Sequence, residues 1–255
     1  MFHLHRRNLI NDTAQPATWL GPGARASLIV GLLIAIALTF RAVVYPTPDE
    51  STLTNAAATG DFAAARRALD AGISPNTEYG LPLLLAAARC DTDITTLLLT
   101  RGADPSLMPI RHYTPLMMAA FAGHAKTVAL LLDAGADPNQ APGAAQTPLA
   151  IAAAWGHEDV VNLLLARGAS PSVNDHDPPL VSAARGGIAS AKLLRRLIDA
   201  GADVNAADSE GVTAIMVARD AGRRDLVLLL LRAGARPHPP RLAQAPAVGP
   251  TRVPS

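Results

Sequence analysis

The most constraining feature of this chain is a stretch of sequence that returns, altered, 33 residues later. Residues 114–139 read TPLMMAAFAGHAKTVALLLDAGADPN, and residues 147–172 read TPLAIAAAWGHEDVVNLLLARGASPS. Self-similarity at a fixed period of this size indicates one supersecondary unit stacked on copies of itself. The sequence therefore constrains the architecture strongly, although it does not identify a partner molecule.

Each unit has the features of two short helices followed by a turn. Thr114 suits a helix N-cap, and the proline after it loses no hydrogen bond at the first helical position. Gly123 is expected to end this helix, and the apolar residues within 126–134 have helical spacing. Gly135 suits a left-handed position after the second helix. One such helix pair cannot bury its apolar face alone, so we expect the copies to stack.

The pattern TPL…AA…GH…V…LL…GADPN resembles the ankyrin repeat, which has a period of 33 residues. The resemblance covers residues 51–237 and implies an all-α solenoid of about six helix–turn–helix repeats. The glycine after the second helix recurs at Gly72, Gly102, Gly135, Gly168, Gly201 and Gly234.

This sequence departs from the ankyrin pattern in three ways. The histidine of the family's TPLH motif is absent, so we expect neighbouring repeats to rely more on apolar packing. Its positions hold Leu84, Met117, Ala150, Val181 and Met216. The connection at residues 73–82 is short, and the helices within 180–200 are predicted to gain about two residues. We expect irregular stacking at both places.

An uncharged stretch, ASLIVGLLIAIALTF, occupies residues 26–40 ahead of the repeats. A helix of this length rises about 22 Å, which is short of the roughly 30 Å of a bilayer core. If Arg41 snorkels to the interface, the span can extend to Tyr45. We therefore predict a transmembrane signal anchor at 26–45, with a cleaved signal peptide and a buried soluble helix as alternatives.

The segments on either side of this span complete the predicted domain organisation. Residues 1–25 are predicted to form a disordered arm and residues 46–50 a linker. Because most nearby arginines precede the span, the positive-inside rule places the N-terminus in the cytoplasm and the repeats outside it, in the periplasm if the cell is bacterial. Secretion after signal cleavage is the alternative. The proline-rich tail, 238–255, is predicted to be disordered.

Composition argues against several classes of function. The net charge of +1 gives no sign of the basic patch typical of nucleic-acid binders. The single Cys90 excludes an internal disulfide and a multi-cysteine metal site, and it occupies a helix-ending glycine position. No catalytic motif is present, and the Asp175-His176-Asp177 run is interpreted as a solvated loop. We expect no cofactor, no metal and no small-molecule substrate.

The resemblance also implies where a partner protein would bind. In ankyrin repeats the finger tips and the exposed side of the first helices line a concave groove that binds proteins. By position, this implies contacts on the first helices and on one finger. The predicted partner-binding residues are Arg89, Phe121, Trp155 and Arg185, with Arg111 and Tyr113 on the finger. Phe121 and Trp155 could instead be ordinary core residues packed between repeats, and His124 and His157 are expected to close the turns between helices.

These observations favour a non-catalytic protein–protein interaction module that is tethered to a membrane. One alternative is a structural homo-oligomer formed through the last repeat, because residues 226–231 are all apolar. A terminal repeat usually has a polar outer face, so something is expected to cover this helix. The remaining alternative is an enzyme whose site is built from scattered residues.

Overall fold

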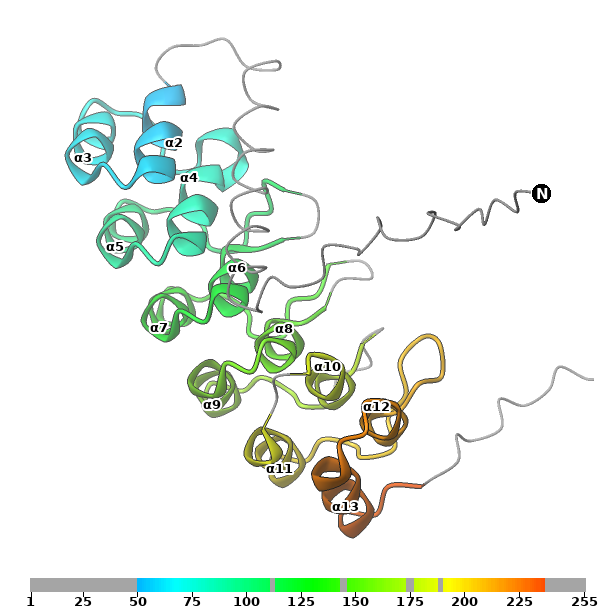
Figure 1. Cartoon of the computed structure of the whole chain (residues 1–255). Helices are drawn as coiled ribbons and strands as arrows, with labels where there is room; N and C mark the ends of the chain where they lie inside the picture. The colour runs from blue at the N-terminus through cyan, green and yellow to red at the C-terminus, as the bar shows by residue number, and fades with distance from the viewer. Residues whose placement is uncertain (1–49, 111–112, 143–145, 173–176, 188–189, 237–255) are drawn as a thin grey trace, which may run out of the picture.

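The computed structural model describes residues 50–110, 113–142, 146–172, 177–187 and 190–236. Within them the chain forms twelve helices, arranged as six consecutive pairs that we call repeats 1 to 6 (Figure 1). The pairs are α2 (Glu50–Thr59) with α3 (Phe62–Asp70), α4 (Thr77–Ala88) with α5 (Thr92–Thr100), α6 (Pro115–Ala122) with α7 (Ala125–Asp133), α8 (Pro148–Ala154) with α9 (Glu158–Ala166), α10 (Pro179–Arg185) with α11 (Ala191–Asp199), and α12 (Ala214–Asp220) with α13 (Arg224–Arg232). The predicted all-α solenoid of six repeats is confirmed for this part of the chain.

The helices form two layers. The first helix of every repeat stacks in one layer and the second helix in the other, and the connecting loops project on the side of the first helices (Figure 1). We call these the first-helix layer and the outer layer. Two of the loops carry an isolated β-bridge, Ile110 with Tyr113 and Ala207 with Thr213. The loops are therefore short hairpin-like fingers at these two places.

The predicted transmembrane segment at 26–45 lies outside the described residues, as do the arm at 1–25 and the tail at 238–255. Among the helices that the structure does describe, none has the length and apolar character needed to cross a bilayer. Residues 46–49 of the predicted linker also lie outside the described part, and α2 begins at Glu50.

The helix ends follow the predicted local chemistry. The hydroxyl oxygen of Thr114 accepts a hydrogen bond from the Met117 N–H at 3.2 Å, and Thr147 caps α8 in the same way. Gly123 ends α6 with a left-handed φ of 77°. These caps satisfy backbone groups that a short helix would otherwise leave unpaired.

The core is a continuous stack of small and aliphatic side chains. The paired alanines of the first helices are at most 4% exposed, as are the residues at the missing histidine positions of repeats 2 to 5. Apolar packing between repeats is therefore confirmed. The buried alanine pairs are Ala86 and Ala87, Ala119 and Ala120, Ala152 and Ala153, and Ala183 and Ala184.

A polar ladder links the turns of neighbouring repeats. The side chain of Asn76 donates to the Gly102 carbonyl at 3.1 Å and accepts from the Asp104 N–H at 2.8 Å. Equivalent rungs start from Asn139, Ser172 and Asn205 in repeats 3, 4 and 5.

One rung of this ladder is replaced. The hydroxyl of Ser106, at the equivalent position of repeat 2, bonds to the Asp104 carboxylate of its own turn at 2.6 Å. The junction between repeats 2 and 3 therefore relies on other contacts.

The predicted lengthening of the repeat 5 helices is wrong. Helices α10 and α11 have 7 and 9 residues, the same lengths as α8 and α9. The additional residues lie in the connection between the two helices, 186–190. Two glycines end α10, and the Ser190 hydroxyl accepts from the Leu193 N–H at 3.1 Å to start α11. The helix ends in repeat 5 are therefore set by these capping residues and not by the apolar pattern.

The short connection at 73–82 contains an unusual backbone turn. Glu78, Tyr79 and Gly80 all have left-handed dihedral angles, with φ of 50°, 58° and 86°. A regular helix cannot include these residues, so the regular part of α4 starts at Leu81, inside the predicted connection. Left-handed geometry at two consecutive non-glycine residues stores conformational energy in this finger.

Cys90 occupies a left-handed position that other repeats fill with glycine. Its φ is 65°, close to the 77° of Gly123 and the 71° of Gly156. We expect Cys90→Gly to raise the free energy of unfolding by about 1 kcal/mol, because a left-handed non-glycine residue costs more than the added freedom of the unfolded chain. Urea denaturation measures this change. Cys90→Ala, which keeps the strain, should be nearly neutral, and a destabilised Cys90→Gly protein would contradict the interpretation.

Gly186 is required for a different reason, namely space. Its backbone is right-handed, but a β-carbon there would overlap the carbonyl oxygen of Ala154 in the preceding repeat. We expect Gly186→Ala to lower the free energy of unfolding by about 2–3 kcal/mol, because backbone cannot move aside as a flexible side chain can. Gly187→Ala is the matched control: it meets open space and incurs only the strain of a φ of 70°. Thermal melts should rank Gly186→Ala below Gly187→Ala, and the reverse order would refute the packing argument.

Candidate functional site

The row of predicted contact residues lies at the C-terminal ends of the first helices. Phe121 is in the last turn of α6, Trp155 is the C-cap of α8, and Arg185 ends α10. Arg89 is the C-cap of α4. The alanine pairs that precede these residues are buried between repeats, whereas Phe121, Trp155, Arg89 and Arg185 lie at the edge of the layer and are partly or fully exposed.

Phe121 and Trp155 form one aromatic pair across the junction of repeats 3 and 4. Their ring centroids are 4.8 Å apart at an interplanar angle of 75°, which is an edge-to-face arrangement. Both side chains are half-buried. The pair is therefore neither ordinary core nor fully solvated, and part of each side chain remains exposed.

His157 holds this aromatic pair in place. Its Nε2 lies 3.0 Å from the Phe121 carbonyl oxygen, so repeat 4 is hydrogen-bonded to repeat 3. The ring also packs over Gly123, where a β-carbon would come within 2.6 Å of the imidazole. The prediction that His157 has a structural role is confirmed, but the bond joins two repeats and does not only close a turn within one.

Arg89 is hydrogen-bonded to the preceding repeat, away from the aromatic pair. Its side chain is exposed, and one guanidinium nitrogen donates to the Thr59 carbonyl at 3.3 Å. This contact joins repeats 1 and 2. The structure does not bring Arg89 into contact with the aromatic pair. The predicted row therefore consists of separate residues along the edge of the layer, and its one cluster is the aromatic pair.

Arg185 is already engaged by two carboxylates of this chain. It lies 3.4 Å from Asp177 and also forms an ion pair with Asp208, whose side chain is only 3% exposed. The hydrogen bond to Asp208 raises the pKa of Arg185. Burial acts to raise the pKa of Asp208, but backbone N–H donors and Arg185 outweigh it, so that pKa is lowered. The arginine therefore braces repeat 5 against the finger of repeat 6.

Of the two predicted finger residues, the structure describes only Tyr113. Tyr113 is 39% exposed and is the β-bridge partner of Ile110. Arg111 lies outside the described residues, as do Asp175 and His176. Asp177, the third residue of that acidic run, is bonded to Gln146 as well as to Arg185. No cluster of three or more potential metal-ligating side chains occurs in the described ranges.

Sequence reasoning missed a hollow beside the left-handed turn. It has a volume of about 630 Å³ and is lined in part by Ile73, Thr77, Tyr79 and Leu107. Tyr79 is 70% exposed, more than any other large hydrophobic or aromatic residue in the described ranges. The shortened repeat interval at 73–82 was the only available signal, and it indicates irregularity without specifying geometry.

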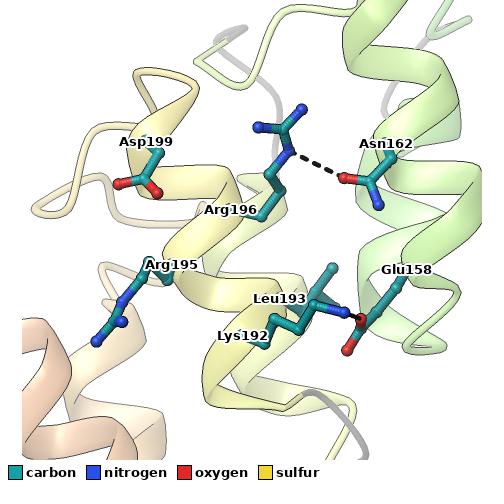
Figure 2. Close-up of a pocket in the computed structure, with 7 residues that line it drawn as sticks. All are labelled: Glu158, Asn162, Lys192, Leu193, Arg195, Arg196 and Asp199. Carbon is teal, nitrogen blue, oxygen red and sulfur yellow. Dashed lines mark hydrogen bonds and ion pairs between the residues drawn. The ribbon is translucent and has the colours of Figure 1, made fainter.

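A second hollow lies on the outer layer between α9 and α11 (Figure 2). It is small, about 170 Å³, and two polar contacts between its lining side chains cross it. Lys192 bridges to Glu158 at 3.0 Å, and the Arg196 Nε donates to Asn162 at 2.9 Å. Figure 2 shows these pairs spanning the two helices, so this hollow is a charged seam between repeats 4 and 5.

Comparison with known proteins supports the repeat assignment. The family described as "Ankyrin repeats (3 copies)" matches residues 83–175, which span the second to fourth repeats and the finger that follows. No curated protein gives a significant match. The stretch 83–175 is therefore an array of ankyrin repeats. Such repeats are generally protein–protein interaction modules and are typically not enzymes.

His124 gives this part of the stack a pH dependence. Burial lowers the pKa of His124, and the nearby His157 lowers it further. Because the folded-state pKa lies below the unfolded value, the unfolded chain binds more protons. The contribution to stability is present above about pH 6.5 and is lost as the pH falls through the folded-state pKa.

We therefore expect the urea midpoint to decrease as the pH is lowered from about 7 to about 5.5, before most carboxylates protonate. His124→Asn, which removes the titrating group and keeps a good capping residue, should make this profile flatter. If the variant and the wild type show the same slope, His124 is not the group responsible.

Proposed function

We propose that this chain is a non-catalytic module that binds another protein through its first-helix layer and fingers. The observation that carries the proposal is the half-exposed Phe121–Trp155 pair, which stands at the C-terminal edge of a layer whose alanine pairs are buried. Aromatic residues dominate interface hot spots because they bury a large area with little loss of side-chain freedom. The ankyrin match at residues 83–175 supports the same type of function.

The rigidity of the site favours binding. The two rings contact each other, and His157 fixes the backbone of Phe121. Little side-chain ordering is therefore required when a partner docks, which leaves more of the contact energy as affinity. Arg185 contributes less to this proposal, because two carboxylates already neutralise its charge.

We also propose a membrane tether through residues 26–45, with the repeats on the extracytoplasmic side. This part rests on the uncharged sequence at 26–40 and on the arginines that precede it. Tethering would raise the effective concentration of the repeats near partners at the same membrane.

Site-specific photo-crosslinking in intact cells tests the binding face. A benzophenone amino acid at position 121 should give an adduct with another protein. The same label at Phe62 is the control, because Phe62 is an accessible aromatic residue at 42% exposure but lies on α3 in the outer layer. Adducts from position 62 and none from position 121 would place the interface on the opposite layer.

The double variant Phe121→Ala/Trp155→Ala should then abolish recovery of that partner. We expect it to remain folded and to lose about 2 kcal/mol of stability, because both rings are half-buried and contact each other. Circular dichroism measures folding in parallel. A folded double variant that still recovers the partner would show that the aromatic pair is not the contact.

A further inference from the structure

The last helix exposes two leucines on the outer layer. Leu226 and Leu230 of α13 are buried in the stack, whereas Leu228 is 56% exposed and Leu231 is 43% exposed. The sequence indicated that this helix is too apolar for a terminal repeat. The structure shows that the excess is confined to these two positions.

Leu228 is not required by the repeat. The same place in the second helices of repeats 2 to 5 is occupied by residues other than large hydrophobics, which are Thr96, Ala129, Asn162 and Arg195. An outward-facing leucine therefore appears only in the last of these helices. Stacking gives no reason for it.

Leu231 occupies a position that every earlier repeat uses for packing. Its equivalents in α5, α7, α9 and α11 are half-buried against the core, and they are Leu99, Leu132, Leu165 and Ile198. No further helix pair covers Leu231 within the described residues. The end of the stack therefore presents an open apolar position beside Leu228.

Arginines surround these leucines. Arg224, Leu228, Leu231 and Arg232 are spaced to share one face of α13. Arg195 holds the position equivalent to Leu228 in the preceding repeat, and Figure 2 shows it pointing toward the last repeat and away from Glu158. We call these five residues the Leu228 face.

Within the described residues, no carboxylate neutralises the charge of the Leu228 face. Arg195, Arg224 and Arg232 are exposed and form no ion pair within the described part of the chain. Elsewhere on the outer layer, Arg101 pairs with Asp70 at 2.7 Å and Arg167 with Asp133 at 2.6 Å.

Two carboxylates lie near the face. Asp225 is bound by Arg223 at 3.1 Å. Asp199 lines the hollow of Figure 2 together with Arg195, but it forms no ion pair with that arginine. The positive charges of these arginines are therefore available to a ligand outside the described residues.

We propose that the Leu228 face docks on an anionic lipid surface. Exposed leucines next to arginines match the chemistry of a bilayer interface, where apolar side chains enter the acyl boundary and guanidinium groups contact phosphates. A protein interface is less favoured, because leucine is under-represented among hot spots and the face contains no aromatic residue. The face lies on the outer layer, so docking there leaves the Phe121–Trp155 pair accessible. The proposal depends neither on the proposed partner nor on residues 26–45.

A fluorophore on the face tests the proposal in the full chain. In a Cys90→Gly background, Leu228→Cys is labelled with the environment-sensitive dye NBD and mixed with vesicles of phosphatidylcholine, with or without 30% phosphatidylglycerol. We expect a blue shift and a gain of emission only with the anionic vesicles. About 0.5 M NaCl should reverse both changes by screening the charges.

Thr96→Cys provides the matched label, because it occupies the same outward position on α5 but the leucines beside it are buried or packed against the core. Its emission should stay unchanged even if another segment holds the chain on the vesicle. Adding Arg195→Gln, Arg224→Gln and Arg232→Gln to the Leu228 label should weaken the response on the order of 100-fold in lipid concentration.

Three results would overturn the proposal. Equal responses from both labels would show that the Leu228 face has no special role. An equally large response with neutral vesicles would show that the arginines do not contribute to the interaction. A shift that grows with protein concentration in the absence of lipid would show that the face contacts a second copy of the chain.

Discussion

The close approach of the first helices is the constraint on which the rest of this structure depends. Alanine pairs such as Ala119–Ala120 and Ala152–Ala153 bring neighbouring helices together because they present almost no side chain. The fit is tight enough that Gly186 has no room for a β-carbon against Ala154. The residues that follow each alanine pair lie at the C-terminal end of the first helix, at the edge of this close contact, where a larger and partly exposed side chain fits. The position of Phe121 and Trp155 therefore follows from the packing of the alanines behind them.

Polar links hold the stack in register without adding to its core. The ladder that starts at Asn76 and the hydrogen bond from His157 each join only adjacent repeats. Stability in such an array is close to a sum of repeat and nearest-neighbour contributions, so a missing link weakens one junction and not the whole. The missing rung at Ser106 lies next to Leu107, which lines the hollow beside Tyr79. The least regular finger and the altered rung thus occur in the same part of the stack.

Local chemistry explains what the sequence could predict. Thr114 and Gly123 act within one helix, and their roles were correctly predicted because capping depends on neighbouring residues. The pairing of Arg185 with Asp208 was not predictable, since it joins two repeats through a finger whose path is not encoded by periodicity. Likewise, the residue types at 121 and 155 suggested an interface, but only the folded stack shows that the two rings touch.

The aromatic pair and the Leu228 face differ in how they could select a ligand. The aromatic pair is fixed by contacts on several sides, so it can discriminate between partners by shape and by the desolvation of polar groups. The Leu228 face consists of flexible arginines around two leucines on one helix, which suits a ligand with many equivalent phosphates and no fixed shape. Because the repeats communicate mainly through nearest neighbours, occupancy of one face requires no rearrangement of the other. A rigid solenoid can in this way keep a shape-specific binding surface exposed on one layer while its other layer rests on a lipid surface that has no specific shape.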